Sequence, residues 1–182
     1  MPTKSKIKRF NFSIFLLTFQ GPIASVVRNA EFYLMRLLGN DCSTKDPIKT
    51  QQMYYALKAI GNAGRPIRMK DIIKDCVRNA AHLNTSIAAI HALKRMPRSA
   101  GIPGFLLEIL SDKNIDAEKR MESFLILMER PSQQEILLAV DMVNDPEEAR
   151  QLRSFIASYL SSMAKHRGPD RKRYLVFFIS MT

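Results

Sequence analysis

The stretch "ALKAIGNAGRP", residues 56–66, places two glycines and an asparagine directly behind an apolar segment with helical spacing. Gly61, Asn62 and Gly64 lie where left-handed backbone angles let a helix end and satisfy its last carbonyl groups. A phosphate-binding loop would carry G-x-x-x-x-G-K-[ST], or G-x-G-x-x-G between a strand and a helix, and neither pattern is present. The stretch therefore predicts the end of a helix.

The same apolar spacing, at i, i+3, i+4 and i+7, continues through most of the chain after residue 22. When the apolar helix centres are aligned, four leucines superpose at separations of 36, 34 and 33 residues. These repeat-core leucines are Leu57, Leu93, Leu127 and Leu160. A second helix is expected between each successive pair, over residues 67–78, 103–111 and 132–143.

Two helices per unit of about 35 residues are typical of an α-helical solenoid, in which one hairpin buries its apolar face only when the next stacks on it. We therefore predict an all-α, HEAT-like solenoid of helix hairpins. A plain helical bundle is the alternative, because only three and a half units are visible.

Residues between the apolar segments carry helix-start signals. In "PSQQE", Ser132 and Glu135 have the spacing of a capping box. In "NDPEEA", Asp145 is expected as N-cap, with Pro146 at the first helical position and two glutamates beside the positive end of the helix dipole. Another helix is expected to start near Pro103.

The net charge of +11 is concentrated at the two ends of the chain. Residues 1–9 and 165–173 each carry +4, which leaves only +3 on residues 10–164. Basic ends on a nearly balanced body are typical of solvated tails rather than of a duplex-binding face, so no nucleic-acid partner is expected.

Two cysteines, Cys42 and Cys76, make neither a disulfide framework nor a zinc-ligand set, and they either pair or remain free buried thiols. No apolar run approaches the roughly 20 residues of a membrane-spanning helix. The N-terminus has the basic-then-apolar order of a signal peptide but lacks a clean cleavage site, so a leader and a first packed helix both remain open.

The sequence carries none of the common catalytic or metal-binding patterns. His82, His91 and His166 form no H-E-x-x-H motif, no G-x-S-x-G elbow occurs, and neither cysteine has a recognisable nucleophile context. We therefore expect no catalytic residue, no metal and no cofactor, and the chain is predicted not to be an enzyme.

Four segments in order resemble the end of the N-terminal helical domain of the large lipid transfer proteins. They are "YYALKAIGNAGRP", "SIAAIHALKRMP", "DAEKRMESFLILMERPSQQEI" and "QLRSFIASYLSSMA". That family includes vitellogenin, apolipophorin, apolipoprotein B and the microsomal triglyceride transfer protein. The positions that match its pattern are Leu57, Ala59, Ile60, Gly61, Asn62, Gly64, Ala89, Ile90, Ala92, Leu93, Arg120, Pro131, Ser132, Ser154, Phe155, Ser158 and Leu160.

The match covers roughly residues 50–165, with two departures from the family pattern. The segment "LNTSIAAI" lacks the usual arginine, and Lys94 replaces the arginine that normally follows Ala-Leu. Both changes concern contacts between helices.

The resemblance implies a two-layered, right-handed helical superhelix that supports a lipid-filled cavity in a secreted protein. Lipids and neighbouring β-sheet domains of the same protein would then be the partners, and the location would be extracellular. No lipid-contacting residue can be named. The chain is expected to be a fragment that holds a partial domain.

The resemblance also divides the chain into three parts. Residues 23–165 are expected to form the helical-repeat domain, residues 1–22 an N-terminal basic and apolar segment, and residues 166–182 a tail outside the domain. A free-standing helical-repeat module for protein–protein interaction is the alternative function.

Overall fold

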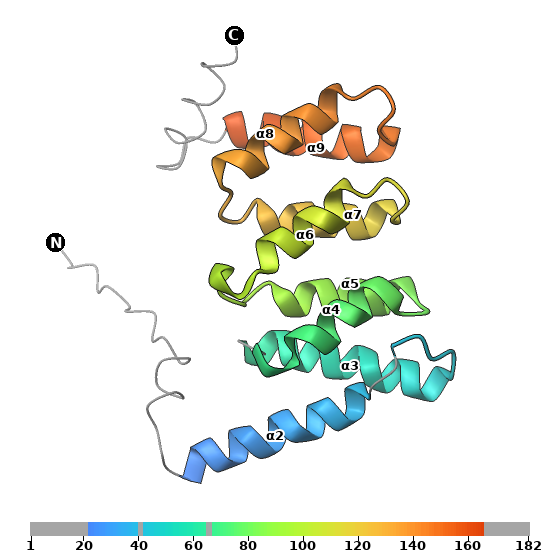
Figure 1. Ribbon diagram of the computed structural model, residues 1–182, viewed down its shortest axis with the longest axis vertical. Coiled ribbons are helices and arrows are strands. Elements are labelled where there is room, and N and C mark those ends of the chain that lie inside the picture. The colour runs from blue at the N-terminus through green and yellow to red at the C-terminus, as the bar shows by residue number, and fades with distance from the viewer. Residues whose placement is uncertain (1–21, 40–41, 65–66, 166–182) are drawn as a thin grey trace, which may run out of the picture.

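The computed structural model describes residues 22–39, 42–64 and 67–165, and every regular element in these ranges is helical (Figure 1). The α-helices are α2 (Pro22–Leu38), α3 (Pro47–Ala63), α4 (Lys70–Asn79), α5 (Leu83–Leu93), α6 (Ile102–Ser111), α7 (Ala117–Leu127), α8 (Gln133–Asn144) and α9 (Arg150–Lys165). Two short 3-10 turns, η1 (Ile67–Met69) and η2 (Arg98–Ala100), precede α4 and α6. The all-α prediction is confirmed.

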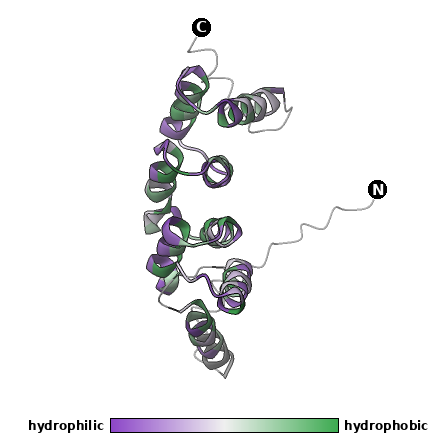
Figure 2. Cartoon of the chain, turned by 90° about the vertical axis from the view of Figure 1, so that its right-hand side faces the viewer, coloured by the Kyte–Doolittle hydropathy of each residue, from purple (hydrophilic) through white to green (hydrophobic). Residues whose placement is uncertain are grey.

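The helices stack in chain order from α2 at one end to α9 at the other (Figure 1). Helices α3, α5, α7 and α9 pack on one another and form a continuous layer, which we call the odd layer. Helices α2, α4, α6 and α8 form the even layer, and each packs mainly on the odd helix that follows it. Figure 2 shows two columns of helices side by side, with α2 at the lower end of the stack. This solenoid-like arrangement differs from a bundle, because the terminal helices lie at opposite ends of the stack.

The four repeat-core leucines occupy equivalent places, one on each helix of the odd layer. Their exposed fractions are 0% for Leu57, 1% for Leu93, 1% for Leu127 and 7% for Leu160. They belong to one continuous hydrophobic core that runs the length of the stack. Burying each side chain contributes about 1.5–3 kcal/mol, so the stacking of units carries most of the stability of the solenoid.

Local signals explain where several helices begin. The Asp46 carboxylate caps α3 by accepting hydrogen bonds from the backbone N–H groups of Ile48 and Lys49, at 2.9 and 3.3 Å. At the start of α8, the Ser132 hydroxyl accepts from the Glu135 N–H at 3.3 Å, and the Glu135 carboxylate accepts from the Ser132 N–H at 2.6 Å. The expected capping box is therefore present.

The start of α9 differs from the prediction. The helix begins at Arg150, and Asp145 instead ends α8, with its carboxylate accepting a 2.9 Å hydrogen bond from the Glu147 N–H. The reason lies in Glu148, whose side chain turns inward to pair with Arg120 and is 3% exposed. That contact holds the segment before Arg150 in a turn, so the N-cap prediction for Asp145 was wrong.

The expected terminal segments lie outside the described residues, except that Pro22 begins α2. Within the described ranges, no helix is both long enough and apolar enough to cross a membrane. The right-handed twist of the superhelix stays a prediction.

Candidate functional site

The three residues of the expected helix stop have different roles. Gly64 caps α3 with φ 74°, and its N–H donates to the Ile60 carbonyl at 3.2 Å. Gly61 and Asn62 lie within the last turn of α3. A Cβ atom on Gly61 would lie 3.2 Å from the Ala92 Cα atom, so this glycine permits the close approach of α3 and α5.

Ion pairs and one histidine–glutamate contact connect each unit to the next, with partners 28 to 37 residues apart. The pairs are Arg78–Glu108, His91–Glu122, Lys94–Glu129, Arg98–Glu135, Lys113–Asp145 and Arg120–Glu148. Because these separations match one repeat, the pairs align successive hairpins rather than bracing single helices.

The Arg120–Glu148 pair is the most deeply buried of these links. The side chains are 2% and 3% exposed, and two hydrogen bonds of 2.7 and 2.5 Å join the guanidinium group to the carboxylate. The remaining Arg120 Nε–H donates to the Leu110 carbonyl at 2.8 Å. Such bidentate geometry offsets the cost of removing two charges from water.

Hydrogen bonding also sets the acid–base properties of these links. The Arg120 guanidinium holds the pKa of Glu148 below its ordinary value of 4.5, although burial acts in the opposite direction. The hydrogen bond between Lys113 and Asp145 likewise raises the lysine pKa and lowers the aspartate pKa.

A disulfide joins Cys42, in the segment before α3, to Cys76 in α4. The two Cα atoms are 5.0 Å apart, and the residues are separated by 34 positions. Nearby, the Ala81 N–H donates to the Cys42 carbonyl at 3.3 Å. The disulfide therefore fastens the first described units together, which settles the alternative that the sequence left open.

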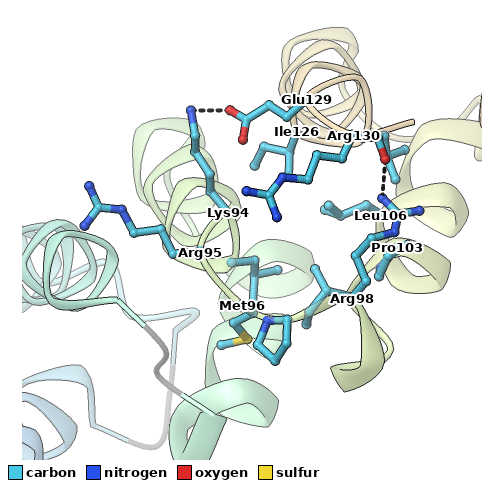
Figure 3. Close-up of a pocket in the computed structure, with 13 residues that line it drawn as sticks. Lys94, Arg95, Met96, Arg98, Pro103, Leu106, Ile126, Glu129 and Arg130 are labelled. Carbon is cyan, nitrogen blue, oxygen red and sulfur yellow. Dashed lines mark hydrogen bonds and ion pairs between the residues drawn. The ribbon is translucent and has the colours of Figure 1, made fainter. Parts of the chain in front are cut away.

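A pocket of about 410 Å³ opens where the end of α5, η2 and the start of α6 meet the end of α7 (Figure 3). We call it the cationic pocket. Its lining residues are Leu93, Lys94, Arg95, Met96, Pro97, Arg98, Ile102, Pro103, Leu106, Ile126, Leu127, Glu129 and Arg130. A pocket of this volume falls at the lower end of the range of small-molecule sites.

Hydrogen bonds hold the rim of the cationic pocket in place. Lys94 pairs with Glu129, and the Arg98 guanidinium donates to the Arg130 carbonyl at 2.9 Å (Figure 3). Arg98 also donates to the Glu135 carboxylate at 2.5 Å, so the capping glutamate of α8 anchors the rim. Arg95 turns away from the pocket and donates to the Asn62 carbonyl at 2.7 Å.

Arg130 is the exception on this rim. Its side chain extends across the pocket towards Lys94 in Figure 3. No described residue forms an ion pair or hydrogen bond with its guanidinium group. The cationic pocket was missed by sequence reasoning, because its charges come from separate helix ends.

The predictions of no metal and no catalytic residue rest on sequence patterns. Within the ranges that the structure describes, no three His, Cys, Asp or Glu side chains gather closely enough to hold a metal ion. His91 lies 2.8 Å from the Glu122 carboxylate in the link between α5 and α7. The histidine therefore takes part in the stacking of helices.

Comparison with known protein families gives a match over residues 24–161 to the model described as "Vitellogenin TPR domain". Among curated proteins, rat (Rattus norvegicus) apolipoprotein B-100 is 26% identical over 144 residues, which cover 76% of this chain and 3% of that protein. Vitellogenin-2 of Gallus gallus is 29% identical over 130 residues, covering 66% of this chain and 7% of the relative.

A third relative, the apolipophorins of Drosophila melanogaster, is 25% identical over 126 residues, which cover 67% of this chain and 4% of that protein. The chain thus spans only a small part of the length of the curated relatives that it matches. No solved structure matches it.

Proposed function

Because the chain belongs to the family of the vitellogenin TPR domain, we propose that it is the helical part of a lipid-transport protein and supports a lipid-binding cavity. The names of its relatives, which include apolipoprotein, vitellogenin and apolipophorins, support this assignment. The observation that carries the supporting role is the continuous core shared by the stacked units. The repeat-core leucines serve this stacking, and the role requires no catalytic group.

Several features of the stack support a mechanical role. Many charged side chains pair with one another between units, and the Arg120–Glu148 pair among them is buried. The cationic pocket, at about 410 Å³, is small for a lipid with two acyl chains. We therefore place the lipid cavity in other parts of the protein.

Neighbouring domains of the same protein are the proposed partners. On α2, the side chains of Phe32 and Tyr33 are 65% and 61% exposed, and Tyr55 on α3 is also 61% exposed. Large aromatic side chains at the end of a helical stack are typical of a surface that another element covers. These residues therefore support the proposal that the described helices are part of a larger domain.

We further propose an extracellular location. Disulfides form and persist in oxidising compartments, and the Cys42–Cys76 bond is consistent with passage through the secretory pathway. The resemblance to the large lipid transfer proteins implies the same location.

The supporting role predicts that the purified 182-residue chain does not bind lipid stoichiometrically. Flotation of the chain with phosphatidylcholine vesicles and with triglyceride emulsions measures this directly. We expect the protein to remain in the dense fraction. Tight, saturable binding of either lipid would overturn the supporting role.

Sequencing of the source transcript tests the family context independently. Continuation into long β-rich sequence beyond residue 165 would support a piece of a lipid carrier. A stop at Thr182, together with a folded monomer in solution, would favour a free-standing interaction module.

A further inference from the structure

We propose that the cationic pocket is a docking site for an acidic peptide segment, in which Arg130 binds one carboxylate and the pocket floor receives an adjacent apolar side chain. This goes beyond the proposed supporting role and does not depend on it. The argument rests on charge, on the accessibility of one guanidinium group, and on the small apolar area of the floor.

The first step is the charge balance around the pocket. Three cations, Lys94, Arg98 and Arg130, lie around it, because Arg95 turns away to the Asn62 carbonyl. Of the two nearby carboxylates, Glu129 lies on the rim and Glu135 is buried behind it. Glu129 is neutralised by Lys94, and Glu135 by Arg98. An excess of positive charge therefore remains at the pocket and favours an anionic partner.

The second step concerns Arg130. Its guanidinium group has no ion-pair or hydrogen-bond partner within the described part of the chain. The Arg98 guanidinium holds the Arg130 carbonyl at 2.9 Å and so fixes the backbone from which this side chain extends. A carboxylate can accept two parallel hydrogen bonds from such a guanidinium, as the Glu148 carboxylate does from Arg120.

The third step is the floor, which decides between a peptide and a lipid. Leu93, Leu106 and Leu127 are each 1% exposed, so little apolar surface remains to cover an acyl chain. Pro103 and Ile126 are half-buried and stay open to contact. This limited area suits one apolar side chain, such as leucine, next to an aspartate or glutamate.

A titration with blocked tripeptides tests the proposal. The probes are leucyl-glutamyl-leucine and its glutamine counterpart, each acetylated and amidated, added to the 15N-labelled chain and followed by NMR. We expect the glutamate peptide to shift amide signals in residues 94–98 and 126–130. The glutamine peptide should bind about tenfold more weakly, because it cannot form a charge-assisted pair.

Two variants assign the binding to Arg130. Arg130→Gln should lower affinity for the glutamate peptide about tenfold, whereas Arg130→Lys should give an intermediate value, because it keeps the charge and loses the bidentate geometry. Arg150→Gln, at an exposed arginine at the start of α9, is the matched control and should leave affinity unchanged. If Arg130→Gln fails to fold, the affinities of the Arg130→Lys variant and of the glutamine peptide still test whether Arg130 binds the carboxylate.

Three outcomes would overturn the proposal. They are equal binding of the glutamate and glutamine peptides, unchanged affinity in Arg130→Gln, and shifts confined to other residues. Short-chain phosphatidylserine is added in a parallel titration. Stronger shifts of the same amide signals by this lipid than by the peptide would assign the pocket to an anionic headgroup instead. None of these results bears on the flotation test of the supporting role.

Discussion

Arg120 and Glu148 place two opposite charges where almost no water reaches them. Replacing such a pair with apolar side chains of similar size is often neutral, whereas removing one partner leaves an uncompensated buried charge. The pair therefore matters less for its net stability than for alignment, because each charge requires the other at a defined place. It joins α7 to the turn before α9 and so determines where the last helix begins.

This pair predicts a loss of stability in acid. The pKa of Glu148 is lower in the folded protein than its ordinary value of 4.5, so above that value its contribution is fully present. As pH falls from about 5 to 3, the unfolded chain binds a proton before the folded chain does, and the free energy of unfolding decreases. Thermal unfolding, followed by circular dichroism between about pH 7 and about pH 3, measures this decrease in the free energy of unfolding.

Two variants separate Glu148 from the other carboxylates. Glu148→Gln should lower the free energy of unfolding at neutral pH by about 3–5 kcal/mol, since Arg120 stays buried without its partner. The double variant R120M/E148L should be close to wild type at neutral pH and show a shallower acid dependence. An unchanged acid dependence in the double variant would assign the effect to other groups.

Gly61 offers a second residue-scale prediction, with Gly104 as its control. Gly61→Ala should destabilise the protein by about 1–3 kcal/mol, because the new Cβ would press on the Ala92 Cα atom at 3.2 Å. At Gly104 in α6, no atom outside the adjacent residues and the backbone of the same helix lies within 4 Å of a Cβ position, so Gly104→Ala should stabilise the protein by about 0.5–1 kcal/mol. Urea denaturation of both variants measures the contrast, and equal effects would contradict the packing role of Gly61.

At the scale of the elements, the start of α8 combines a local and a long-range function. Ser132 and Glu135 satisfy each other's backbone N–H groups, as the sequence pattern indicates. The Glu135 carboxylate also accepts a hydrogen bond from Arg98, one unit earlier. The same side chain thus ends the loop before α8 and holds the rim of the cationic pocket.

Ser132→Ala should isolate the local function of this cap. Loss of the hydroxyl acceptor is expected to lower the free energy of unfolding by about 1 kcal/mol. The bond from Arg98 to Glu135 is retained in this variant, so the NMR signals of residues 94–98 should not move. Chemical denaturation gives the first value, and shifted signals in that range would show that cap and rim are coupled.

The predictability of these elements depended on how local their signals are. The spacing of Leu57, Leu93, Leu127 and Leu160 predicted the hairpins, because a repeated apolar face is encoded within each helix. The start of α9 was not predicted, because the Glu148 side chain pairs with Arg120, 28 residues away, rather than lying at the N-terminus of its own helix. Local capping rules take no account of such a competing partner.

At the scale of the whole molecule, the candidate site was the least predictable part. The cationic pocket takes Lys94 and Arg98 from one unit and Glu129 and Arg130 from the next. In the sequence these are isolated charges, and only the stacking of α5 on α7 brings them together. The resemblance to lipid carriers indicated the family but identified no contact residue. The cationic pocket became visible only in the structure.

The disulfide predicts a redox dependence of the folded state. A bond that closes a loop between residues 34 positions apart should stabilise the protein by about 4 kcal/mol through the entropy of the unfolded chain. Reduction should therefore lower the free energy of unfolding by a comparable amount. Guanidinium denaturation with and without reductant measures this, and a variant with serine at both Cys42 and Cys76 should be insensitive to the reductant.

The unequal packing of the two layers has a mechanical consequence. The odd helices pack against one another along the stack, whereas the even helices pack chiefly against odd helices. Bending that opens the even layer therefore separates few packed surfaces, while bending that opens the odd layer pulls the core apart. We expect the stack to behave like a hinged strip, compliant in one direction and stiff in the other. A stack of this kind can change its curvature without unfolding.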